Sequence, residues 1–227
     1  MPSDISALIA SFNTALKSAR SLSSKIRSID RSHLLLSELY DSESSVPLLK
    51  GKLSTDNCSI YGNRRDLISS LKDLDIRRIC EVGVLNGTFS KFAMETLEDF
   101  EIYYLVDRSF DKITADLDNY NSKIVKLEGD SSMVMDKGIP NASLDLIYID
   151  GDHSYKGVAK DTEVALRKIK KGGFIIFNDY SCFNQACITP YGVLKCVHEL
   201  LASHPKSRIV SLSLSPVDLK DICIKVL

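Results

Sequence analysis

The chain has 227 residues, of which 44% are hydrophobic and 26% are charged, and its formal net charge is −1. This composition is typical of a globular protein that can bury a core without disulfides or metals. The small net charge gives no reason to expect a nucleic-acid or anionic-membrane partner. No apolar run approaches the about 20 residues of a membrane helix, and no secretory signal is apparent. We therefore expect a cytoplasmic protein with neither kind of partner.

The first 63 residues predict an N-terminal helix followed by a linker or lid. Apolar residues recur from Ile5 to Ile29 at alternating steps of three and four, which is a heptad pattern. The apolar stripe of such a helix must be buried, either against its own domain or in a homodimer or higher homo-oligomer. The Ser-, Lys- and Arg-rich composition is also shared by mitochondrial transit peptides, although acidic residues in the segment count against that alternative. Residues 41–63 contain Pro and Gly breakers and predict the linker or lid.

Residues 64–227 predict one α/β domain in which strands alternate with helices. Alternation of this kind produces right-handed crossovers and a parallel sheet that is covered on both faces. The last two strands are joined by a short connection and should pair antiparallel. We expect a doubly wound, mostly parallel seven-stranded sheet with an antiparallel last strand. The expected strands are 78–82, 102–107, 123–127, 144–150, 174–177, 209–214 and 222–227, and the expected helices are 66–74, 88–98, a stretch ending near 118, 155–170 and 190–203.

A glycine-containing loop follows the first strand of this domain. Glu81, Gly83 and Gly87 have the spacing E-x-G-x-x-x-G, and a helix is expected to begin directly after them. The glycines allow a tight turn and a close approach of the backbone to a ligand. The spacing differs from the G-x-G-x-x-G loop that binds a dinucleotide pyrophosphate. Its acidic first residue would repel a pyrophosphate and suits a ligand that carries positive charge.

Polar residues also follow the next three strands. Asp107 ends the second strand, where a carboxylate can accept ribose hydroxyls, and Asp130 with Ser131 follows the third. Asp150 ends the fourth strand. Each aspartate could instead cap a helix. Because the carboxyl ends of parallel strands lie along one edge of a sheet, their joint occurrence favours a binding site for a nucleoside.

The order of these motifs over residues 64–227 resembles the class I S-adenosylmethionine (SAM) methyltransferases, which have a Rossmann-like fold. Residues 148–155 (YIDGDHSY) and 172–180 (GGFIIFNDY) resemble the small-molecule O-methyltransferases, above all the sugar-hydroxyl enzymes that include the macrocin and novobiocin methyltransferases. The resemblance implies methyl transfer from SAM to a hydroxyl of a small molecule, with a sugar or polyol as the acceptor. It implies these cofactor contacts: Glu81, Gly83 and Gly87 at the methionine, Asp107 at the ribose, Asp130 and Ser131 at the adenine, and Asp150 near the reacting methyl group.

The same resemblance implies residues for the chemistry. A divalent ion, Mg²⁺ in these families, would be held by Asp150, Asn178 and Asp179, whose oxygen donors suit a hard cation. The sugar enzymes usually have two aspartates after the fifth strand, whereas Asn178 takes the first of these positions here, and this puts metal dependence in doubt. For the general base, the resemblance favours Asp152, whereas His153 has the ordinary pKa closer to neutrality.

Two other functions stay open at this stage. A nucleotide-binding oxidoreductase could use a similar sheet, although the loop lacks its third glycine. A methyltransferase fold without catalysis could serve as an assembly module through the heptad helix, although the acidic residues of the reaction site are intact. Binding of SAM or of NAD would distinguish the first alternative from the methyltransferase.

Overall fold

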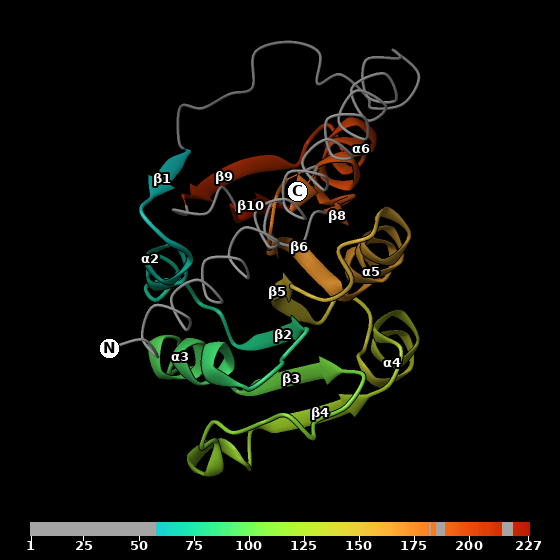
Figure 1. Ribbon diagram of the computed structural model, residues 1–227. Coiled ribbons are helices and arrows are strands. Elements are labelled where there is room, and N and C mark those ends of the chain that lie inside the picture. Colours follow the sequence, from blue (N-terminus) through green and yellow to red (C-terminus); the bar gives the residue numbers. More distant parts are fainter. Residues whose placement is uncertain (1–57, 182, 185–188, 215–219) are drawn as a thin grey trace, which may run out of the picture. The chain divides into compact units, whose positions relative to one another are not determined.

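The computed structural model describes residues 58–181, 183–184, 189–214 and 220–227 (Figure 1). For residues 183–184 and 189–190 only the backbone is described. The predicted heptad helix, and with it the predicted oligomer contact, lies outside these residues. Most of the predicted linker over 41–63 lies outside them too.

The main sheet has eight strands, and most of them are parallel. Their order is β4-β3-β2-β5-β6-β10-β9-β1. The chain runs outward from β2 to β4 and then returns to place β5 beside β2, so the direction of winding changes between β2 and β5. Strand β10 is antiparallel to both of its neighbours, β6 and β9. The strands are β1 (Ser59–Tyr61), β2 (Arg78–Val82), β3 (Ile102–Asp107), β4 (Ile124–Glu128), β5 (Leu144–Ile149), β6 (Ile169–Phe177), β9 (Arg208–Ser213) and β10 (Ile222–Lys225).

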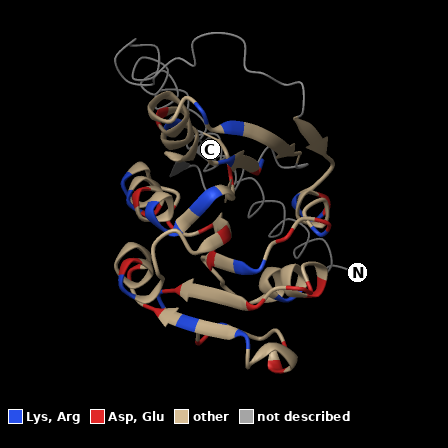
Figure 2. Ribbon diagram, turned by 180° about the vertical axis from the view of Figure 1, so that it is seen from behind, with Lys and Arg blue, Asp and Glu red and all other residues tan. Residues whose placement is uncertain are grey.

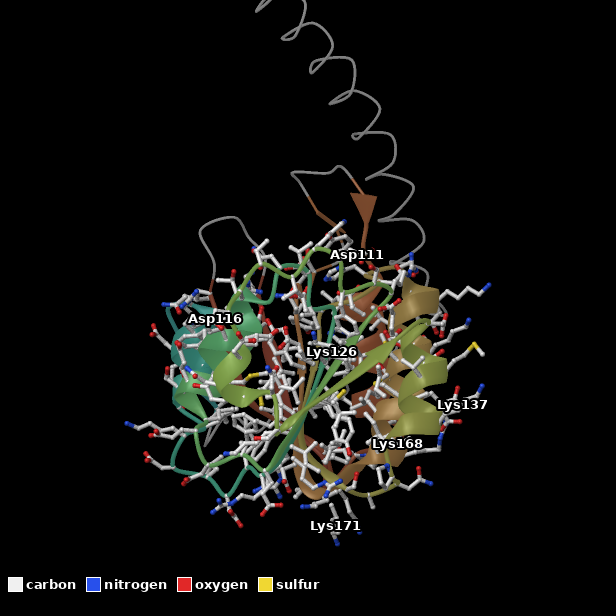
Figure 3. The ribbon with its side chains drawn as sticks, turned by 90° about the horizontal axis from the view of Figure 1, so that it is seen from below. Asp111, Asp116, Lys126, Lys137, Lys168 and Lys171 are labelled. Atoms are coloured by element: carbon white, nitrogen blue, oxygen red, sulfur yellow. The ribbon has the colours of Figure 1, made fainter. Side chains whose placement is uncertain are left out.

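Helices cover both faces of the sheet, as Figure 3 shows in a view from below. Helices α2 and α3 contribute buried side chains to one hydrophobic cluster, and α4, α5 and α6 contribute to the other. Because both faces are covered, central strands such as β2 and β5 are almost entirely buried. The helices are α2 (Arg64–Ser69), α3 (Thr88–Thr96), the 3₁₀ turn η1 (Asp118–Tyr120), α4 (Ser131–Gly138), α5 (Tyr155–Lys168) and α6 (Val193–Ser203), and the short strands β7 (Phe183–Asn184) and β8 (Thr189–Pro190) form a separate pair.

This architecture confirms the predicted doubly wound α/β fold, its mostly parallel sheet and its antiparallel last strand. The sheet has eight strands instead of the expected seven, because β1 pairs in parallel with β9 at the edge. Strand β1 falls within the segment 41–63 that was predicted as a linker. Helix α4 was not predicted.

The prediction of a helix that ends near residue 118 was wrong, because the described residues between β3 and η1 form no helix. In that stretch side chains form local hydrogen bonds that replace helical ones: the amide of Asp111 donates to Ser109 Oγ, and the amide of Asp118 donates to Asp116 Oδ1. The amides of Thr114 and Ala115 donate to the carbonyl oxygen of Asn86. The stretch therefore packs against the loop that follows β2.

Charged residues of both signs mix along α4 and α5 (Figure 2). In the described part of the chain, no helix is both long enough and apolar enough to cross a membrane.

Candidate active site

The candidate site lies where β2 and β5 end side by side, at the point where the winding direction changes. Such switch points are where doubly wound sheets bind ligands. The amide of Gly83 donates to the carbonyl of Val106, and the amide of Asp150 donates to the carbonyl of Val82. Gly83 has a φ of 87°, and a Cβ at this position would collide with the main chain of Asp150. Glycine is therefore required here by both backbone conformation and space.

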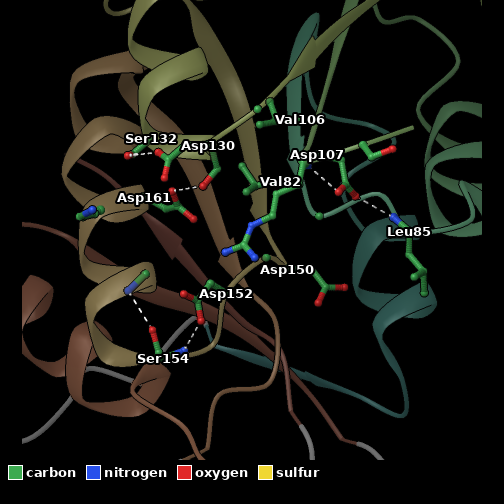
Figure 4. A pocket seen from close by; sticks show the side chains of 18 of the residues that line it. Val82, Leu85, Val106, Asp107, Asp130, Ser132, Asp150, Asp152, Ser154 and Asp161 are labelled. Carbon is green, nitrogen blue, oxygen red and sulfur yellow. Dashed lines mark hydrogen bonds between the residues drawn. The ribbon is translucent and has the colours of Figure 1, made fainter. Parts of the chain in front are cut away.

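A cavity of about 1030 Å³ opens along these strand ends (Figure 4). Its volume lies at the upper end of the range of roughly 300–1,000 Å³ that small-molecule sites have. Residues from the four segments that follow β2, β3, β4 and β5 face it, which brings most of the predicted cofactor-binding residues together. They include Val82, Gly83, Asp107, Asp130, Ser131, Asp150, Asp152 and Asp161.

Asp107 connects the end of β3 to the loop after β2. Its Oδ2 accepts hydrogen bonds from the amides of Val84 (2.8 Å) and Leu85 (3.0 Å), and its Oδ1 accepts from the amide of Arg108 (2.7 Å). Leu85 has a φ of 51°, a conformation that is uncommon for a residue with a side chain. Asp107 therefore fixes the shape of this loop and also lines the cavity (Figure 4).

Asp130 and Ser131 lie at the start of α4. The Asp130 side chain is the N-cap of this helix, since it accepts from the amide of Met133 at 3.2 Å. Ser131 Oγ donates to Oδ1 of Asp161 at 2.6 Å. Asp161 is buried, its Oδ2 has no hydrogen-bond partner among the described residues, and burial raises its pKa to about 6. Asp130 thus serves as a helix cap and faces the cavity as well.

Glu81 lies under the loop rather than along the cavity. It is 1% exposed, and its carboxyl group accepts hydrogen bonds from Ser90 Oγ (3.0 Å) and Tyr103 OH (2.7 Å). Burial raises the pKa of Glu81 to about 8, although both of these hydrogen bonds lower it. Gly87, at the other end of the loop, is the N-cap of α3 with a φ of 76°.

His153 lies between two carboxylates. Its Nε2 is 3.5 Å from Oδ1 of Asp150 and 3.5 Å from Oδ2 of Asp179. Its ring stacks on that of Tyr191, with a centroid distance of 4.6 Å and an interplanar angle of 15°. Burial lowers the pKa of His153, but the neighbouring carboxylates outweigh burial, so the net shift is upward. Burial raises the pKa of Asp179, and the charge of His153 opposes that shift.

A buried hydrogen-bond network supports this cluster from below. Asn178 Nδ2 donates to Oδ1 of Asp221 at 2.9 Å, and Tyr148 OH donates to Oδ2 of Asp221 at 2.7 Å. Burial raises the pKa of Asp221 to about 6. Because the amide nitrogen of Asn178 is bonded to Asp221, the side-chain oxygen of Asn178 is the atom left to face His153, whose pKa it helps to raise.

Asp152 follows Asp150 by two residues, and Arg64 contacts Asp150 from another part of the chain. Asp152 is exposed, lines the cavity and accepts from the amide of Ser154 at 2.9 Å (Figure 4). Arg64 lies on α2 and is not one of the residues that line the cavity. Its Nη1 is 3.4 Å from Oδ2 of Asp150. Sequence reasoning predicted Asp152 but missed Arg64, Asp161, Tyr148 and Asp221. Asp221 carried no local signal, because its partners are 43 and 73 residues away in the sequence.

The comparisons with known proteins agree with this geometry. Residues 80–180 match the model of a family described as a methyltransferase domain. Over 64 residues, the chain is 34% identical to the uncharacterized protein R132 of Acanthamoeba polyphaga mimivirus, a stretch that covers 28% of each chain. The matched stretch therefore spans less than a third of that relative.

Solved structures of methyltransferases share the fold. An O-methyltransferase from Bacillus cereus, in complex with SAH, superposes with a TM-score of 0.57 at 16% identity and covers 89% of this chain and 90% of its own. The O-methyltransferase TomG from Streptomyces achromogenes, in complex with SAM, gives a TM-score of 0.55 at 15% identity and covers 72% and 80% of the two chains. The prediction of a class I SAM methyltransferase fold is confirmed. The match to the methyltransferase-domain model is confined to residues 80–180 of this chain.

Proposed function

We propose that this protein is a SAM-dependent O-methyltransferase that acts on a small molecule. The observation that carries the proposal is that a cofactor-sized cavity meets a carboxylate–imidazole–carboxylate cluster. Asp150 belongs to both, the cluster lies at the ends of β5 and β6, and its residues fall within the stretch that matches a methyltransferase domain. The cavity would hold the cofactor. The cluster provides a group that can take a proton from an acceptor hydroxyl.

In this proposal the adenosine of SAM occupies the cavity. A carboxylate can accept about four hydrogen bonds, and Asp107 uses three for the loop, so it keeps capacity for a ribose hydroxyl. Asp130 and Ser131 would lie at the adenine. Gly83 presents its backbone to the methionyl part, and Gly87 shapes the loop. Glu81 would act from beneath the loop, through Ser90 on α3, because its carboxyl oxygens are already bonded.

We assign the general base to His153 rather than Asp152. Methyl transfer is an in-line displacement: the acceptor oxygen bonds to the methyl carbon, the carbon–sulfur bond breaks, and SAH leaves as the hydroxyl proton passes to the base. His153 Nε2 faces Asp150 and Asp179, next to the strand end where the methyl group would lie. Asp152 faces the side of the cavity that Asp161 lines and is bonded to Ser154. A neutral imidazole held near two carboxylates is a good proton acceptor near neutral pH.

The predicted magnesium ligands do not fit a metal ion as they are arranged. The imidazole of His153 lies between the carboxylates of Asp150 and Asp179, where the ion would bind, although the side-chain oxygen of Asn178 stays available because only its nitrogen is bonded to Asp221. No group of three or more His, Cys, Asp or Glu side chains in the described residues is arranged to hold a metal ion. If activity is lost in EDTA and restored by Mg²⁺, the predicted ligand set is correct and this arrangement changes when the ion binds.

For the acceptor we propose a sugar or another polyol. The groups around the base are carboxylates and the Asn178 amide, which hydrogen-bond well to neighbouring hydroxyls. A panel of sugars and phenols, offered with labelled SAM, would test the assignment; transfer to phenols alone would refute it.

A homodimer through residues 5–29 and a cytoplasmic location also remain predictions, and size-exclusion chromatography of the full chain and of a chain beginning at residue 58 would test the dimer.

Calorimetric titration with SAM tests the central proposal, with NAD as the comparison ligand. We expect binding of SAM and none of NAD; the reverse result would refute the proposal. His153→Ala should abolish turnover while SAM still binds, and Asp152→Ala should retain most of it. Loss of turnover in the Asp152 variant alone would reverse the assignment of the base.

A further inference from the structure

Arg64 is a cation held at the end of the cofactor site, and none of the roles described above uses it. It begins helix α2, and its guanidinium carbon lies 4.7 Å from the ring centroid of Phe89. Phe89 belongs to the first turn of α3, which follows the glycine-containing loop directly. Stacking on an aromatic ring fixes the plane of a guanidinium while leaving its N–H groups at the edge available. Arg64 is thus oriented and keeps 43% of its side chain exposed.

The surroundings of Arg64 are acidic. Its Nη1 lies 3.4 Å from Oδ2 of Asp150, a long distance for a charge-assisted hydrogen bond. Arg64 also forms a hydrogen bond with Tyr148, and the buried carboxyl group of Asp221 acts on it electrostatically. A guanidinium has five N–H donors. The contacts with Asp150 and Tyr148 do not use all five donors, so Arg64 keeps N–H groups that can bind a second anionic group.

The position of Arg64 matches one end of SAM. The cavity is lined by Asp130, Asp107, Gly83 and Asp150, which follow β4, β3, β2 and β5, four strands that are neighbours in this order in the sheet. With the adenosine at Asp130 and Asp107, as proposed, the methionyl tail would lie at Gly83 and Asp150. Arg64 reaches Asp150 at this end. The tail of SAM carries an ammonium group, which suits the carboxylate of Asp150, and a carboxylate group, which requires a cation or several N–H donors.

Among the described residues, the two basic side chains within 4 Å of Asp150 are His153 and Arg64. The proposed base must be neutral when it accepts a proton, so it is a poor permanent partner for an anion. Arg64 keeps its charge at every physiological pH, and its fork of N–H groups matches a carboxylate.

We infer that Arg64 binds the carboxylate of the methionyl tail and thereby selects SAM over cofactor analogues that lack this carboxylate. This inference rests on the proposed function, because it takes SAM as the ligand. It assigns α2 and the segment that follows β1 to the cofactor site, although both precede the region that matches the methyltransferase domain.

The chain offers a matched control. Arg65 is the next residue of the same helix, and its guanidinium carbon lies 4.5 Å from the ring centroid of Phe92, one turn further along α3. Arg64 and Arg65 therefore make the same kind of contact with the same helix. Of the two arginines, Arg64 is the one whose guanidinium reaches Asp150, with Nη1 3.4 Å from Oδ2. The variants Arg64→Gln and Arg65→Gln remove the same charge and the same stacking interaction at the two positions.

The experiment measures by calorimetry how the full-length wild type and both variants bind SAM and decarboxylated SAM, which retains the sulfonium and the amine. A hydrogen bond to a charged group contributes about 1.5–3 kcal/mol, so Arg64→Gln should weaken SAM binding about 10- to 150-fold. Binding of decarboxylated SAM should change less than about threefold. Arg65→Gln should bind both ligands as the wild type does. Arg64→Lys, which keeps the charge without the fork, should show a smaller loss for SAM alone.

Each outcome has one interpretation. If Arg64→Gln binds SAM as the wild type does, or loses both ligands equally, Arg64 does not bind the carboxylate and the inference is refuted while the proposed function stands. If the wild type binds no SAM, the proposed function fails, and the inference fails with it. Thermal unfolding of each variant, followed by circular dichroism, identifies a folding defect; should Arg64→Gln not fold, the selective loss in Arg64→Lys decides the question.

Discussion

Replacing Glu81 by glutamine should stabilise the folded protein at alkaline pH. Burial raises the pKa of this carboxyl group from 4.5 to about 8, so the folded state keeps a proton that the unfolded chain releases at lower pH. The contribution of Glu81 to the free energy of unfolding is therefore fully present below about pH 4.5, and it is lost as the pH rises to about 8. A difference of about 3.5 pH units, at about 1.4 kcal/mol per unit, corresponds to about 5 kcal/mol as an upper limit.

Glutamine has nearly the same shape, can accept from Ser90 and can donate to the hydroxyl oxygen of Tyr103, but it does not ionise. The chain contains no tryptophan, so urea unfolding is best followed by circular dichroism. Relative to the wild type, Glu81→Gln should gain stability progressively between pH 5 and pH 8.5. The other buried acids are common to both proteins and cancel in the difference. Glu98→Gln, on an exposed position, should show no such gain. Parallel pH profiles for wild type and Glu81→Gln would refute the reasoning.

Three further predictions concern the site. Gly83→Ala places a Cβ against the main chain of Asp150 and should prevent folding or cost more than about 3 kcal/mol, whereas Gly172→Ala, at nearly the same φ but with open space, should cost only about 1–2 kcal/mol; equal urea midpoints would contradict this contrast. Asp107→Ala removes three hydrogen bonds and should weaken SAM binding at least about 10-fold by calorimetry, so an unchanged Kd would show that the loop holds its shape alone. The kcat/KM for methyl transfer should rise with pH through a midpoint above 6.5, because His153 must be unprotonated to act and its pKa is raised; a midpoint below 6.5 would contradict the assignment.

The fold could be predicted from sequence because its strands are short apolar runs that alternate with amphipathic helices. The predicted strand ends were accurate enough to identify four residues that line one cavity: Gly83, Asp107, Asp130 and Asp150. The prediction failed where side chains bond to their own backbone, as in the stretch before η1, since those residues compete with helix formation without disturbing the apolar pattern. Strand β1 was missed because three residues at a sheet edge carry no periodicity.

The site was predictable only where its residues adjoin strand ends. Asp150, His153 and Asp179 do so, and their proximity follows from parallel strand order. Asp221 approaches from the antiparallel strand β10 and meets Tyr148 within the sheet, so its position depends on tertiary packing. Which way His153 points, toward the carboxylates rather than the adenosine side, also depends on packing, in this case on Tyr191.

A close contact between the start of α5 and the start of α6 holds the proposed base in place. Gly192 precedes α6, its amide donates to the carbonyl of His153 at 2.8 Å, and a Cβ at this position would collide with the backbone of Tyr155. Tyr191 stacks on the imidazole from the same turn. The start of α6 and the loop that carries the base must therefore move as one piece. Substitutions that reshape the start of α6 should therefore also displace the imidazole, so a change made far from His153 in the sequence should lower turnover.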